Sequence, residues 1–139
     1  MQIPAFRLPS LTDNTMVDTA ELKGRVLLLT FFATWCPPCI QEIPTLNDLQ
    51  QTFQKKGFTV LGLSVDEGGT DLLLKLIEKY EIAYPVVLAD PDLARAFGGI
   101  SGIPVTFLTN RQGEIVKKYL GYVGHDVLEG DIKKMLAEG

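Results

Sequence analysis

The chain has 139 residues, a net charge of −4 and a hydrophobic share of 46%, which fits one globular domain over residues 1–139. The mildly acidic balance argues against nucleic acid as a partner, because the few scattered lysine pairs could not neutralise a phosphate backbone. The longest apolar stretch, residues 26–35, has about half of the ~20 residues that a spanning helix needs, so we expect no membrane segment. The first residues also lack the basic and apolar regions of a signal peptide.

The first half of the chain contains the clearest structural patterns. Residues 1–24 are predicted to form an irregular N-terminal extension that closes in a short helical turn. The near-continuous apolar run Val26–Ala33 predicts a strand that is buried on both faces. Pro37 suits the first turn of a helix, Pro44 should kink it, and Gly57 should end it after about Lys56. One buried stripe is expected along this helix, made of Ile40, Ile43, Leu46, Leu49 and Phe53.

The second half alternates shorter strands and helices. Strands are predicted over 58–65, 86–88, 104–109 and 114–122, the last two joined by a hairpin turn that contains Gly113. Helices are predicted from a Thr70 cap to about Tyr80, from Asp90 to about Phe97, and over 126–137. The side chains expected to face inward from the first and last of these helices are Leu73, Leu74, Ile77 and Tyr80, and Val127, Leu128, Ile132 and Leu136. The order β-α-β-α-β-α-β-β-α predicts an α/β fold with a mixed central β-sheet and helices on both faces.

The only two cysteines, Cys36 and Cys39, lie where the first predicted strand meets the first predicted helix. The unsatisfied N–H groups and positive dipole of the helix start should favour the Cys36 thiolate, which is the species that attacks disulfides. Cys39 lies one turn further on and could release a mixed-disulfide partner. A Cys-X-X-Cys pair in a βαβ pattern therefore predicts a redox centre.

Three other interpretations of the cysteine pair compete with a redox centre: buried free thiols, half of a zinc site, and a passive disulfide. A zinc site would need two more ligands, and the single histidine, His125, lies far along the chain. A disulfide that closes so short a loop would stabilise little. We expect no metal and no cofactor.

Three segments resemble the TlpA/ResA-like branch of the thioredoxin superfamily: Leu29–Pro44 with its Trp-Cys-Pro-Pro-Cys centre, Tyr84–Asp90, and Gly99–Leu108. The resemblance runs from about residue 5 to the end. It implies a thioredoxin-like fold and thiol–disulfide exchange with protein cysteines. In this family such proteins usually act outside the cytoplasm, often as reductants in cytochrome c assembly, and are exported or membrane-tethered. A signal or anchor would then lie outside this sequence.

The resemblance also implies roles for particular residues. Cys36 would be the exposed nucleophile and Cys39 the buried resolving thiol. Pro104 would follow a cis peptide bond from Ile103, leaving the Ile103 backbone free to pair with an incoming peptide; the alternative is a trans proline at the start of an edge strand. Trp35 would form part of the docking surface.

Glu42 would be the acid–base group, three residues after Cys39; the alternative is a first-turn acid that the helix dipole favours. One departure matters here, because ordinary thioredoxins place a buried aspartate six positions before the first cysteine, where this chain has Thr30. Either Glu42 or water must then take the proton of the resolving thiol, or this proton transfer is slower. Glu67 could approach from another loop, although a solvated acid is the simpler interpretation.

The sequence thus predicts an enzyme, a monomeric thiol–disulfide oxidoreductase with protein thiol or disulfide substrates and an upstream redox partner, in a periplasmic or other extracytoplasmic setting. One alternative is a binding domain of the same fold with an idle disulfide. Another is a peroxidase, but Leu29 and Ala33 stand where the peroxiredoxin pattern before Cys36 requires proline and threonine.

Overall fold

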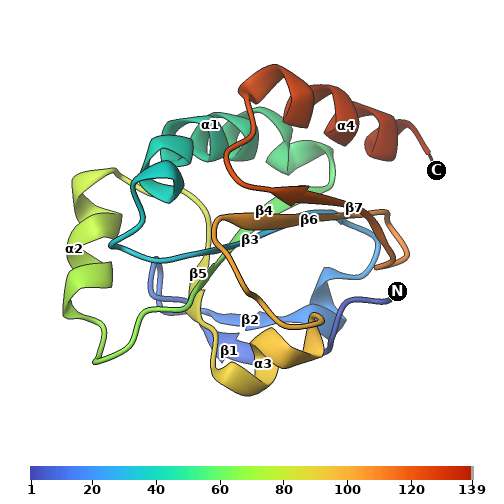
Figure 1. Cartoon of the computed structure of the whole chain (residues 1–139). Coiled ribbons are helices and arrows are strands. Elements are labelled where there is room, and N and C mark those ends of the chain that lie inside the picture. The colour runs from blue at the N-terminus through green and yellow to red at the C-terminus, as the bar shows by residue number, and fades with distance from the viewer. Residues whose placement is uncertain (139) are drawn as a thin grey trace.

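The computed structural model describes residues 1–138 as a five-stranded sheet with helices on both faces and a small N-terminal hairpin (Figure 1). The strands are β1 (Arg7–Pro9), β2 (Met16–Asp18), β3 (Val26–Phe32), β4 (Phe58–Ser64), β5 (Val86–Leu88), β6 (Val105–Thr109) and β7 (Ile115–Leu120). The helices are α1 (Pro37–Phe53), α2 (Asp71–Lys79), α3 (Pro91–Ala96) and α4 (His125–Ala137), with 3-10 turns at Thr19–Leu22 and Gln54–Lys56. In this described part, no helix is both long and apolar enough to cross a bilayer.

The central sheet has the strand order β5-β4-β3-β6-β7. The β3, β4 and β5 strands run parallel, whereas β6 pairs antiparallel with both β3 and β7. The middle strand β3 is fully buried, as its unbroken apolar run predicts. The predicted mixed sheet is confirmed, and β3 delivers the chain to the cysteine pair from the centre of the molecule.

Each face of the sheet has its own apolar layer. On one face, even-numbered residues of β3 pack with α1, α2 and α4; on the other, its odd-numbered residues pack with α3 and the N-terminal segment (Figure 1). This split follows from the two-residue period of a strand. The aromatic side chains Phe31, Phe97 and Phe107 meet in edge-on and tilted contacts within the second layer.

The structure differs from the sequence prediction in four places. Residues 1–24 are not irregular, because β1 and β2 form an antiparallel pair whose Val17 is buried against the sheet. The Thr70 side chain makes no capping hydrogen bond. Leu74 and Val127, both expected inward, are exposed, while Leu73, Leu128 and Ile132 are buried as expected. The α1 stripe is confirmed in full, with Ile40 partly buried and the rest in the core.

Candidate active site: the Cys36–Cys39 disulfide

The two cysteines form a disulfide at the start of α1, with their Cα atoms 5.3 Å apart. Cys36 occupies the N-cap position, and Pro37 and Pro38 fill the first turn. The Cys39 backbone N–H donates to Cys36 Sγ at 3.3 Å. The first turn of a helix has unsatisfied donors, and here one of them already points at the sulfur. Charge on Cys36 Sγ would be stabilised by this contact once the disulfide is opened.

Trp35 is the prominent surface feature beside the disulfide, with 68% of its surface exposed. The cysteines themselves are covered, since Cys36 is 5% exposed and Cys39 3%. The expectation of an exposed Cys36 next to a buried Cys39 is therefore wrong for the disulfide form, because both side chains pack in the apolar layer that contains α1. The two cysteines differ in their position relative to α1: Cys36 is the N-cap residue, whereas Cys39 lies within the first turn of the helix.

A cis peptide bond joins Ile103 and Pro104, as the resemblance implies. The loop that carries it lies against the disulfide, with the Ile103 carbonyl oxygen 3.9 Å from Cys36 Sγ. The Pro104 carbonyl accepts from the Gly121 N–H at 2.9 Å, which ties this loop to the end of β7. Trp35, Ile103 and the cysteines, separated by up to 68 residues in the chain, thus meet at one site.

Asp66 fixes the loop that leads into the cysteines. Its carboxylate accepts from the Thr34 N–H at 3.0 and 3.1 Å, from the Thr34 hydroxyl at 2.6 Å and from the Ser64 hydroxyl at 2.6 Å. A single carboxylate thereby links the end of β4 to the turn after β3. The sequence analysis missed this residue; the available signal was an acid directly after a buried strand that neighbours the cysteine-bearing one.

Glu42 is a buried acid on α1, only 2% exposed. Its Oε2 accepts from the Val123 N–H at 2.7 Å, and burial in the apolar layer raises the pKa of its carboxyl from 4.5 to about 7, while this hydrogen bond acts in the opposite direction. The alternative of a first-turn acid favoured by the helix dipole is wrong, because α1 begins at Pro37 and Glu42 lies beyond its first turn. Within residues 1–138, the hydrogen bond of Glu42 goes to Val123 rather than to a sulfur.

Thr30, on the strand below, forms a neutral pair. The Thr106 hydroxyl donates to the Thr30 hydroxyl at 3.0 Å, and both side chains are buried at directly paired positions of β6 and β3. Glu67, by contrast, is exposed on the loop after β4. Glu42 is consequently the acid that the fold buries in the cysteine-bearing layer.

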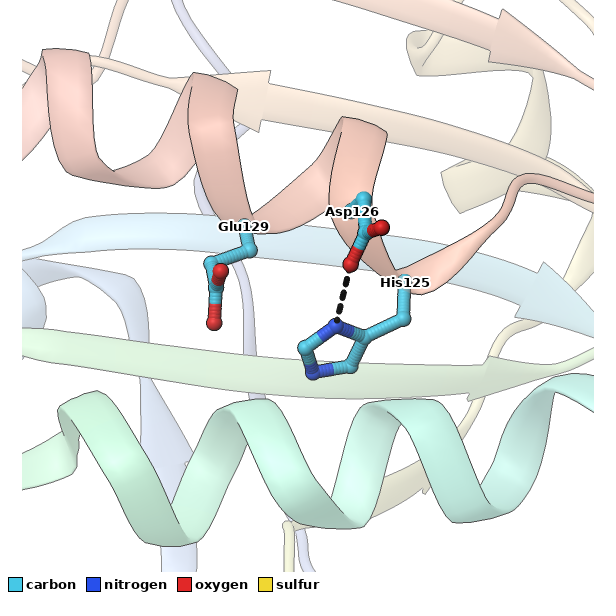
Figure 2. A group of neighbouring side chains, drawn as sticks. All are labelled: His125, Asp126 and Glu129. Carbon is cyan, nitrogen blue, oxygen red and sulfur yellow. Dashed lines mark hydrogen bonds and ion pairs between the residues drawn. The ribbon is translucent and has the colours of Figure 1, made fainter.

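His125 lies at the start of α4, near Asp126 and Glu129, and these side chains reach toward α1 (Figure 2). The Nε2 atom of the ring lies 2.6 Å from the Asp48 carboxylate of α1, and Nδ1 lies 3.4 Å from Asp126. The Asp48 hydrogen bond raises the pKa of His125 above 6.5. His125 therefore ties α4 to α1, two residues after Val123, whose N–H donates to Glu42.

Comparison with known proteins agrees with this geometry. The Redoxin family matches residues 1–136. The chain belongs to this family. Thiol-disulfide oxidoreductase ResA of Bacillus thuringiensis is 30% identical over 96% of this chain and 76% of its own length. This redoxin also resembles a thioredoxin-family thiol:disulfide interchange protein of Chlorobium tepidum, with 34% identity, a TM-score of 0.90, and 98% and 96% of the two chains covered.

A second Chlorobium tepidum structure, assigned as thiol:disulfide interchange protein DsbE, is 30% identical with a TM-score of 0.86, and the match covers 97% of this chain and 95% of that one. The predicted TlpA/ResA-like relationship and the thioredoxin-like fold are confirmed. The redoxin is a thiol–disulfide oxidoreductase, and the Cys36–Cys39 disulfide is the matching chemical group in its structure.

Proposed function

We propose that this redoxin reduces disulfides in partner proteins, with Cys36 as the nucleophile and Cys39 as the resolving thiol. The observation that supports these roles is the placement of Cys36 at the N-cap of α1, where its sulfur accepts from the Cys39 N–H and faces the Ile103 carbonyl. The relatives named ResA and DsbE support an extracytoplasmic setting and a part in cytochrome c maturation.

The reaction starts from the dithiol form. The Cys36 thiolate attacks one sulfur of the substrate disulfide, so a mixed disulfide forms and one substrate thiolate leaves. Cys39 then loses its proton and attacks Cys36 Sγ, which releases the second substrate thiolate. The substrate gains two electrons, and the redoxin ends in the disulfide state described here. An upstream dithiol partner must reduce it again.

Two parts of the site prepare it for a peptide. The Ile103 carbonyl oxygen lies 3.9 Å from Cys36 Sγ, so an extended segment that pairs with this backbone would lie beside the sulfur. Trp35, exposed on the same edge, offers a broad apolar contact. We assign substrate binding to Trp35, Ile103 and Pro104.

Glu42 is proposed to take the Cys39 proton. The two residues lie one turn apart on α1, and a pKa of about 7 lets Glu42 accept a proton near neutral pH and return it. In Glu42→Gln, the resolving step should slow roughly tenfold or more, and its pH dependence near 7 should disappear. An unchanged rate and pH profile would assign the proton transfer to water.

The decisive test is a substrate-reduction assay with two cysteine variants. Cys36→Ser should abolish reduction of a disulfide substrate such as insulin, whereas Cys39→Ser should accumulate a mixed disulfide through Cys36, detectable by mass spectrometry. Equal activity of Cys36→Ser and wild type, with both shown to be folded by circular dichroism, would refute the proposed function. It would favour the alternative of a binding domain whose disulfide takes no part in catalysis. Equilibration with glutathione gives the direction, and a reductant should have a potential below about −200 mV.

A further inference from the structure

Trp35 stands between two surface grooves of opposite charge. The first, here called the acidic groove, has a volume of about 680 Å³ and contains Asp66, Glu67 and Asp90 but no lysine, arginine or histidine. The second, here called the basic groove, has a volume of about 380 Å³ and contains Lys75 and Lys79 but no carboxylate. Trp35 lines both grooves, so it forms the wall that they share.

Each groove is lined by residues that neighbour the disulfide. Ile103, whose carbonyl oxygen lies 3.9 Å from Cys36 Sγ, lines the acidic groove. Ile40, the residue after Cys39, lines the basic groove, and its N–H donates to the Cys36 carbonyl. A cysteine of a bound partner therefore has an approach from either side of Trp35.

The basic groove combines apolar surface with two free cations. Leu72 is 67% exposed, and partly buried apolar side chains are added by Leu76 on the same helix and by Tyr80, which caps its C-terminus. Lys75 and Lys79 lie one turn apart, so they flank this surface. Neither lysine forms an ion pair with any of residues 1–138, although Lys79 lies 5.5 Å from the centre of the Tyr80 ring.

We propose that the basic groove docks a protein segment in which the reactive cysteine is flanked by acidic and aliphatic residues. This inference rests on the proposed function, since a carrier of electrons must meet two partners in turn. The partner recognised here has charge opposite to that of the partner recognised by the acidic groove. Complementary charge steers encounter and rejects wrong partners more than it adds affinity.

A lipid surface fits the basic groove less well than a protein segment does. Each lysine near an anionic membrane contributes on the order of 1 kcal/mol, and the groove has only two in a chain of net charge −4. The groove is also lined by Trp35 and Ile40, which directly precede and follow the Cys36–Cys39 segment, so a protein segment bound there would lie beside the disulfide.

The experiment uses Cys39→Ser protein whose Cys36 has been converted to a mixed disulfide with thionitrobenzoate. Two thiol peptides, Leu-Glu-Cys-Glu-Leu and Leu-Lys-Cys-Lys-Leu, attack this disulfide, and the released thionitrobenzoate gives the rate. Successful loading of Cys36 tests the proposed function separately from the groove. Comparing variants with the same peptide cancels the peptide's intrinsic thiol reactivity.

In the Lys75→Glu/Lys79→Glu variant, the acidic peptide should react roughly tenfold more slowly at low salt, and the basic peptide should not. Glu67→Lys/Asp90→Lys should slow the basic peptide instead. As a control, Lys55→Glu/Lys56→Glu makes the same change in net charge in the 3-10 turn after α1. Both peptides should react with this control about as fast as with the protein that has no lysine substitutions. High salt should remove the differences.

Equal slowing of both peptides in Lys75→Glu/Lys79→Glu, or equal slowing by the Lys55/Lys56 control, would overturn the proposal. Vesicles that contain phosphatidylserine provide the last arm. Lysine-dependent vesicle binding together with unchanged peptide rates would assign this surface to a membrane and likewise refute it.

Discussion

Replacing Glu42 with glutamine should make the protein's stability less sensitive to pH. The carboxyl group has an ordinary pKa of 4.5 and a pKa of about 7 in the folded protein, because it is buried under α1. Between these values the folded state keeps a proton that the unfolded state has lost. Stability from this group is thus fully present below pH 4.5 and is lost as the pH rises through 7.

The size of the effect follows from the same pKa values. One pKa unit corresponds to about 1.4 kcal/mol, so the difference between 4.5 and about 7 amounts to about 3 kcal/mol. In Glu42→Gln, the amide oxygen can still accept from the Val123 N–H, which lies 2.7 Å from the carboxylate, but the side chain no longer titrates. Above pH 7 the variant should therefore gain stability relative to wild type.

Urea unfolding of the oxidised protein at pH 5 and pH 8 measures this difference. Part of the effect is already lost at pH 5, which lies above the ordinary pKa of 4.5. The loss of unfolding free energy between the two pH values should therefore be about 2.5 kcal/mol smaller in Glu42→Gln than in wild type. Glu78→Gln, which removes an exposed acid on α2, should lose as much as wild type. Equal losses in wild type and Glu42→Gln would refute the assignment of a buried, proton-retaining Glu42.

Three other contacts give predictions of the same kind. Asp66→Ala removes the acceptor of the Thr34 and Ser64 hydrogen bonds and should lower the free energy of unfolding by about 1–3 kcal/mol in urea titration. An unchanged free energy of unfolding would show that the loop before Cys36 does not depend on Asp66 for its stability. Thr30→Val or Thr106→Val alone should cost about 1–3 kcal/mol, but the double variant should cost clearly less than the sum, and additive losses would contradict a shared hydrogen bond. Asp48→Asn should lower the pKa of His125 toward its ordinary value in an NMR titration, and an unmoved titration would show that Asp48 does not hold the ring.

Elements with an unbroken pattern could be predicted from the sequence, and those without one could not. The apolar run at 26–33 is near-continuous, as in a strand buried on both faces, and the α1 stripe recurs every three or four residues, so strand and helix could be predicted directly. The run Leu72-Leu73-Leu74 has no such phase, because three adjacent leucines cannot all face one side of a helix. Only Leu73 is buried, and packing against the sheet decides this.

The same limit applies to the site. The cysteines and the cis bond at Pro104 were visible because motifs mark them. The partner of Glu42 is a backbone N–H that lies 81 residues away, and Asp66 reaches Thr34 across 32 residues. Nearly every residue has a backbone N–H, whatever its side chain, so no sequence pattern could have identified Val123 as the donor to Glu42.

The position of the buried acid has a consequence for the chemistry. Thr30 and Thr106 leave the strand side of the layer uncharged, and Glu42 supplies the acid from the helix side. A second carboxylate in this apolar layer would raise the pKa of both acids, so one strand acid and one helix acid would oppose each other's ionisation. With the acid on α1, its separation from Cys39 is set by a single helical turn rather than by the register between strand and helix. Any movement of α1 during disulfide opening would then carry the proposed proton acceptor along with the thiol that it serves.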